Sequence, residues 1–181
     1  MSATHVPLPC ASLFVRAEEG PLEIGFDAVR AYHGHGALAM LALVFQGQRG
    51  ALPLLEADGL PVPRHELRVV SGHPGPGVRD ALEFVTRAVT RGCYEIDLSL
   101  PQARYSAGRD KSYSFQLIRG PRRVHAVLRQ GVLPDEFFAL LGDTSVQGRQ
   151  RHAQLRKEIA ERVLLASPQA LFDFTVLTTD A

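Results

Sequence analysis

The sequence predicts a single α+β domain in which helices cover one face of a small mixed sheet. An apolar segment follows Ala37, two stretches have helical periodicity, and several alternate apolar and polar residues as strands do. The expected order is α-β-α-β-β-β followed by C-terminal helices. Residues 1–20 should form an N-terminal arm, residues 21–174 the domain and residues 175–181 a tail.

The N-terminal half alternates helices with one strand. PLEIGFDAVRAYH has apolar residues at helical spacing after a proline, which predicts a helix over residues 21–32. The segment after Ala37 is apolar nearly all round, as in a central buried helix, and Pro53 must kink or split it. A short strand over residues 66–72 then leads through the turn HPGPG into the amphipathic helix VRDALEFVTRAV.

The C-terminal half contains the remaining strands. In CYEIDLSL, Tyr94, Ile96 and Leu98 alternate with polar residues, which predicts a half-buried strand. SYSFQLIRGPRRVHAVLRQ alternates on both sides of a Gly-Pro turn and predicts a β-hairpin. PDEFFALLG predicts a short helix, residues 146–166 a longer one, and SPQALFDFTVL an extended tail with an aromatic anchor.

Charge and cysteine content narrow the function classes. The formal net charge is +1, from 20 basic against 19 acidic residues, so nucleic acid and anionic membranes are not the expected partners. The N-terminal sequence lacks signal-peptide character, which predicts a cytoplasmic protein. Cys10 and Cys93 are far apart, which excludes a disulfide framework and a thiolate zinc ribbon.

The stretch AYHGHGALAMLALVF places His33 and His35 directly before the apolar helix. Their side chains would diverge on a helix but share a ligand in an extended segment, which Gly34 and Gly36 permit. The positive potential of a helix N-terminus disfavours imidazolium and leaves a ring nitrogen able to bind a metal. The alternative is that the pair only caps the helix or lies on the surface.

A second candidate loop, SGHPGPG, presents His73 after a strand and before a helix whose N–H groups could hold an anion. If the two helices begin at the same end of the sheet, His33, His35 and His73 converge. Three imidazoles and a water would then form an open tetrahedral zinc site. The alternative is a tight turn in which the glycines serve geometry only.

The remaining reactive residues have simpler interpretations. Cys93 opens a strand and is expected to be a core thiol rather than a nucleophile. The basic stretch within residues 144–157 should be a solvated helix face. The other histidines are assigned to a tail, a linker, a strand face and that solvated helix: His5, His65, His125 and His152.

VRAYHGHGALAMLALVFQG resembles the F-H-G-H-x-C-P-G-L-A-x-G opening of the formylmethanofuran dehydrogenase E-like (FmdE-like) family, with Tyr32 in the aromatic position and His33, Gly34 and His35 matching. GVRDALEFVTRAVTRG, DKSYSFQLIRGPRRVHAVL and LLASPQALFDF are similar to later segments of that family, so the resemblance covers about residues 22–174. It implies an α-β-α-β-β-β domain that binds zinc or a similar divalent ion, with no established reaction.

The chain departs from this family at its cysteines. Ala37 to Ala39 replace Cys-Pro-Gly and Thr86 to Val89 replace T-G-C-T, so a soft thiolate site is not expected. In one interpretation His73 replaces a thiolate and the three histidines hold a harder divalent ion with Lewis-acid chemistry. In the other, the pocket is metal-free and binds a small organic ligand or serves as an oligomeric scaffold.

The resemblance also sets the candidate partners and ligand contacts. The ligand-binding candidates beside the metal ligands are Tyr32, Gly34, Gly75 and Gly77. The candidate partners are a second copy of the chain, as a homodimer, and a molybdenum or tungsten enzyme.

Overall fold

The computed structural model describes residues 11–34, 36–100 and 112–178 and has the predicted α+β class. Its elements in chain order are β1 (Ser12–Ala17), β2 (Gly20–Gly25), α1 (Phe26–His33), α2 (Leu38–Ala51), η1 (Leu52–Leu55), η2 (Arg64–Glu66), β3 (Arg68–Ser71), α3 (Pro76–Thr86), β4 (Tyr94–Ile96), β5 (Phe115–Arg119), β6 (Arg122–Leu128), α4 (Asp135–Ala139), η3 (Leu140–Gly142), α5 (Val146–Leu165), α6 (Pro168–Leu171) and β7 (Phe172–Thr178).

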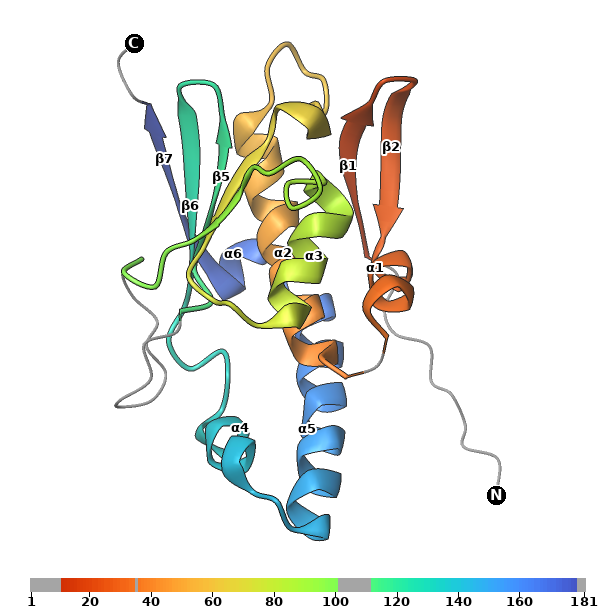
Figure 1. Cartoon of the computed structure of the whole chain (residues 1–181), viewed down its shortest axis with the longest axis vertical. Coiled ribbons are helices and arrows are strands. Elements are labelled where there is room, and N and C mark those ends of the chain that lie inside the picture. The colour runs from red at the N-terminus through yellow and green to blue at the C-terminus, as the bar shows by residue number, and fades with distance from the viewer. Residues whose placement is uncertain (1–10, 35, 101–111, 179–181) are drawn as a thin grey trace.

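Five strands form the main sheet in the order β4-β3-β5-β6-β7. The β3–β4 pair is parallel and the other pairs are antiparallel, so the sheet is mixed, as predicted. Helices α2 and α3 lie between this sheet and a second, two-stranded sheet made of β1 and β2 (Figure 1). α5 extends beyond the sheet, with α4 beside it.

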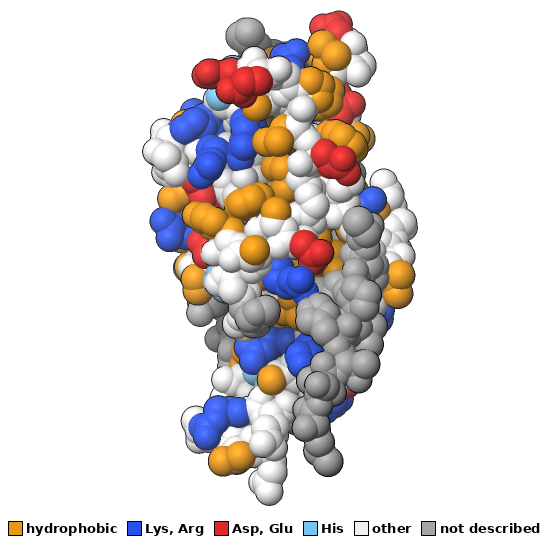
Figure 2. Space-filling model, turned by 90° about the vertical axis from the view of Figure 1, so that its right-hand side faces the viewer, with side chains coloured by type: hydrophobic (Ala, Val, Ile, Leu, Met, Phe, Trp, Pro, Cys, Tyr) orange, Lys and Arg blue, Asp and Glu red, His pale blue; other side chains and the backbone are white. Residues whose placement is uncertain are grey.

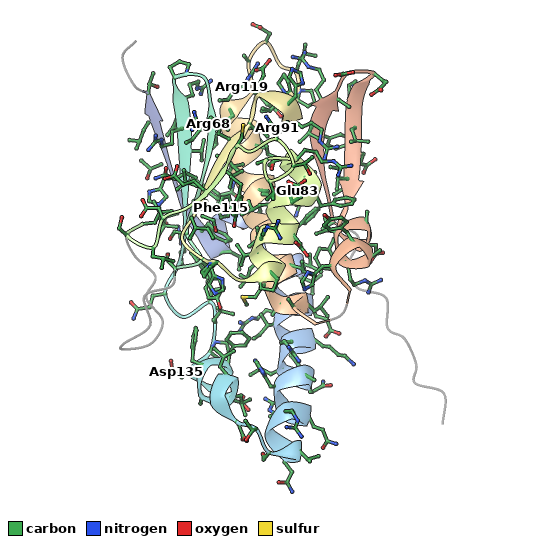
Figure 3. All side chains as sticks on the ribbon, in the orientation of Figure 1. Arg68, Glu83, Arg91, Phe115, Arg119 and Asp135 are labelled. Carbon is green, nitrogen blue, oxygen red and sulfur yellow. The ribbon has the colours of Figure 1, made fainter. Side chains whose placement is uncertain are left out.

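Helix α2 is buried because other elements cover it on several sides. The five-stranded sheet, α3, α5 and β1 all contact it. Gly47 brings its backbone close to the sheet, since a Cβ there would lie 2.7 Å from Cε1 of Phe115, which lies between the sheet and the helices (Figure 3). The α-helix ends at Ala51 and the chain continues as the 3₁₀ turn η1, which contains Pro53, so the predicted split of the helix is confirmed.

The predicted N-terminal arm and first helix are partly wrong. Residues 12–17 form β1 and pair with β2, so the helix expected over residues 21–32 begins only at Phe26. Leu13, Val15 and Ile24 are buried, and this alternation is a strand pattern. Figure 2 views this side of the molecule, where hydrophobic side chains intermingle with acidic and basic ones.

Two further predictions need correction at the edges of the five-stranded sheet. The expected tail becomes β7, whose residues up to Thr178 pair with β6. At the other edge, β4 has only three residues, and Ile96 and Leu98 are each 44% exposed instead of half-buried in a longer strand. The hairpin between these edges is confirmed as β5 and β6, with Leu117 and Val124 facing the core.

Polar side chains hold the C-terminal end of α3. The carboxylate of Glu83 accepts a hydrogen bond of 2.6 Å from the Val89 backbone N–H. The guanidinium of Arg91 donates to the carbonyls of His65, at 2.6 Å, and Thr86, at 3.3 Å. Both side chains are labelled in Figure 3. These charge-assisted bonds hold the turn after α3 against its last residues and join that turn to η2.

The segment Leu38–Leu55 is long and apolar enough to cross a membrane, but 78% of it is buried inside the protein. Its apolar composition is accounted for by its position as the central helix of the fold. The cytoplasmic location stays a prediction.

We expect Gly47→Ala to lower the free energy of unfolding by about 1–3 kcal/mol, because the added methyl group would overpack against two fully buried rings, Phe115 and Phe172. Urea denaturation measures this change. Gly25→Ala is the control, because nothing lies within 4 Å of a Cβ at Gly25. A stabilised Gly47→Ala protein would contradict the close packing of α2 on the sheet.

Candidate functional site

A cavity of about 270 Å³ lies where α2 and α3 begin, beside α4 and α5. Its walls are mainly apolar and its few polar side chains include two histidines and an arginine. The lining residues are Gly36, Ala37, Met40, His73, Gly75, Pro76, Gly77, Val78, Tyr113, Phe137, Phe138, Leu141, His152 and Arg156. Of the predicted site residues, the cavity therefore includes His73, Gly75 and Gly77.

Gly75 and Gly77 are needed for close packing at this cavity. A Cβ at Gly77 would lie 2.4 Å from Cβ of Ala37, so the starts of α2 and α3 touch here. A Cβ at Gly75 would lie 2.5 Å from Cε1 of His73. Both distances are shorter than real Cβ contacts, so a larger residue at either position would displace Ala37 or the ring of His73.

The ring of His73 is held in place from two sides. It stacks on Tyr113 with ring centroids 4.7 Å apart and an interplanar angle of 14°. Its Nδ1 accepts a hydrogen bond of 2.9 Å from the Gly75 backbone N–H. Because a neutral imidazole with Nδ1 as acceptor carries its proton on Nε2, neither nitrogen has a lone pair available to a metal in this conformation.

His33 has a different environment at the C-terminal end of α1. Its Nδ1 lies 2.7 Å from Oδ2 of Asp80 on α3. As a carboxylate only accepts, Nδ1 carries a proton, and in the neutral form of the ring Nε2 has the lone pair that a metal would need. Sequence reasoning missed Asp80, although it lies in the VRDAL stretch that contributes to the family resemblance.

Tyr32 and Gly34 lie outside the cavity. The exposed Tyr32 ring packs on Phe84, with centroids 5.3 Å apart. Gly34 ends α1 with a φ of 88°, and its N–H donates to the Arg30 carbonyl at 2.8 Å. Both residues therefore have structural roles here, and a positive φ favours glycine.

The structure describes two of the three histidines of the predicted metal site, His33 and His73. Within residues 11–34, 36–100 and 112–178, no group of three His, Cys, Asp or Glu side chains is arranged to hold a metal ion. His35 lies outside the described residues, so the ligand set as a whole stays a prediction. The lone-pair geometry of His73 argues against its part in that set.

Sequence reasoning also missed the residues that α5 contributes. His152 was assigned to a solvated helix face, but it lines the cavity and packs edge-on against Phe137 with centroids 5.1 Å apart. Burial lowers the pKa of His152, and the charge of Arg156, one turn later, lowers it further. Arg156 donates a hydrogen bond of 2.6 Å to the Gly36 carbonyl and so joins α5 to the residue just before the start of α2.

The electrostatic surroundings of the cavity favour negative charge. α2 and α3 both begin here without a side-chain cap on their first N–H groups. Arg156 adds a full positive charge, and no Asp or Glu is among the described residues that line the cavity. Helix N-termini and guanidinium groups both stabilise anions and disfavour cations.

Comparison with protein-family models and with curated protein sequences found no match. The resemblance to the FmdE-like family therefore stays a prediction that rests on the quoted residues.

Lowering the pH from 7 to 5 should lower the free energy of unfolding, partly through His152 and His125, whose pKa values burial lowers. The unfolded chain titrates its histidines near pH 6.5, so it binds more protons than the folded protein below that pH. His152→Gln should weaken this pH dependence, and His65→Gln, at a histidine that is 59% exposed, is the control. Urea denaturation at pH 7, 6 and 5 measures the free energy of unfolding as a function of pH. The same pH dependence in His152→Gln as in the unmodified protein would contradict the buried environment of His152.

Proposed function

We propose that the chain is a small-molecule-binding protein whose ligand occupies the cavity between α2, α3, α4 and α5. The observation that carries this proposal is a concave, mainly apolar cavity in which a few polar groups converge. This is the metal-free interpretation of the sequence. At about 270 Å³, the cavity is slightly smaller than the roughly 300–1,000 Å³ typical of ligand sites, which points to a compact ligand.

The residues around the cavity suit a binding role. Tyr113, Phe138 and Met40 supply aromatic and flexible apolar surface against which a ligand can bury its own apolar area. Arg156 and His152 supply polar contacts on one side. Helix α2, which supplies Met40 at the cavity, is packed closely against Phe115 of the sheet. The ligand would therefore enter a largely preformed site.

Leu141→Trp should reduce ligand affinity at least about tenfold, because a larger side chain at this cavity-lining position would occupy ligand space. Val146→Trp is the matched control: both residues are exposed apolar side chains, 41% and 62% exposed, and Val146 does not line the cavity. Titrations of labelled protein with a panel of compact aromatic acids, amides and amines, followed by NMR at the Gly75 and Gly77 amides, measure this. Equal affinities in the two variants would place the ligand elsewhere.

We infer a second candidate function, binding of a divalent ion such as zinc, from the His33–Asp80 pair. A carboxylate that accepts from the second ring nitrogen is the usual partner of a metal-bound histidine. Nε2 of His33 and a nitrogen of His35 would then be the protein ligands, and the ion would act as a Lewis acid. This candidate follows the FmdE-like resemblance, with Asp80 added and His73 removed.

If this second candidate holds, Asp80→Asn should weaken zinc binding by about 10–100-fold, because the orienting carboxylate is lost. Asp27→Asn is the control, since Asp27 is 74% exposed in an ion pair on α1. Elemental analysis of protein purified without chelator, with zinc titration of both variants and of His33→Ala, measures this. Zinc content unchanged by His33→Ala would eliminate the site.

The assembly partners stay proposals. A homodimer would be seen by light scattering coupled to size-exclusion chromatography, and a molybdenum or tungsten enzyme would have to co-purify with the chain.

A further inference from the structure

We propose that the cavity selects an organic acid, with one anionic group on a compact apolar body, and that Arg156 recognises the anion. This inference rests on the proposed small-molecule function and adds the charge of the ligand. Three observations carry the inference: the guanidinium of Arg156, the buried and unpartnered Nε2 of His152, and the absence of Asp and Glu among the described residues that line the cavity.

Arg156 is the only charged side chain among the described residues that line the cavity. Its guanidinium already donates to the Gly36 carbonyl at 2.6 Å, which holds it at the start of α2. A guanidinium presents several N–H donors, so one such bond leaves others for a carboxylate or phosphate.

His152 supplies an independent observation. Its Nε2 is buried and has no hydrogen-bond partner among the residues that the structure describes. Burial and the charge of Arg156 both favour the neutral ring, so one nitrogen keeps a proton that it can donate. In the tautomer with the proton on Nε2, this nitrogen is a buried donor without a partner, which is costly, and a ligand oxygen would satisfy it.

The backbone adds donors of the same kind. The N–H groups of Gly77 and Val78 lie in the first turn of α3, where no side chain caps them. The apolar body of the ligand would lie against the apolar side chains of Phe138 and Met40. The cavity therefore offers donors for an anion and apolar surface for the rest of one compact molecule.

The probes are benzoate, phenyl phosphate, benzamide and benzylamine, which share a ring and differ in charge. Titrations are followed at the ¹⁵N–¹H signals of Gly75, Gly77 and Val78. We expect benzoate or phenyl phosphate to bind at least about tenfold more tightly than benzamide, and benzylamine to bind most weakly. The better of the two anions identifies a carboxylate or a phosphate ester as the preferred group.

Three variants test the role of Arg156. Arg156→Gln should lower the affinity for the preferred anion to that for benzamide and leave benzamide binding unchanged. Arg156→Lys should restore most of the anion preference, which separates charge from loss of the Gly36 contact. Arg149→Gln, on the same helix and exposed, is the control and should change nothing.

The outcomes separate this inference from the function on which it rests. Benzamide binding as tightly as benzoate and phenyl phosphate would overturn the anion preference and leave the small-molecule function standing. Full anion affinity in Arg156→Gln would overturn the role of the arginine. No perturbation of the three amides by any probe would overturn both proposals.

Discussion

The burial of α2 is the constraint on which the other parts of the fold depend. The glycine at position 47 lets the helix approach Phe115 and Phe172 of the sheet. Strand β1, from the two-stranded sheet, also packs on the helix. A helix covered in this way needs apolar residues nearly all round, and the sequence after Ala37 supplies them. The α-helix begins after Ala37 and ends at Ala51, where Pro53 follows in η1, so the buried segment of the helix has defined limits.

The placement of α5, and through it the site, follows from a buried polar side chain on this helix. Gln46 is fully buried, and its Nε2 donates to the carbonyls of Val163, at 2.8 Å, and Ala166, at 2.9 Å. These carbonyls belong to the C-terminal end of α5, where backbone acceptors lack helical partners. Because the C-terminal end of α5 is held on α2, the preceding part of α5 lies beside the cavity. His152 and Arg156, more than two helical turns before that end, line the cavity.

The periodicity of apolar residues predicts the elements that bury one regular face. It fails where a strand pattern and a helix pattern follow each other directly in the sequence. The β5–β6 hairpin and α5 have clear periods of two and of about 3.6 residues, and both were found. PLEIGFDAVRAYH contains strand signals followed by helix signals. The predicted helix therefore includes the residues of β2, whereas the observed helix begins only at Phe26. The sequence predicts a tail where β7 lies, because nothing local in LFDFTVL shows that β6 has a free edge with which this segment can pair.

The site was harder to predict, since its chemistry comes from residues far apart in the chain. HGH stands out by composition, whereas Arg156 lies 120 positions from its partner Gly36 and resembles any residue of a solvated helix face. The sign of the local potential then separates the two binding modes. Two uncapped helix starts and a guanidinium oppose a divalent cation near the loop, with Asp80 the carboxylate beside His33. An ion held there by neutral histidines would need further negative charge, which the organic anion that we propose for the adjacent cavity would supply.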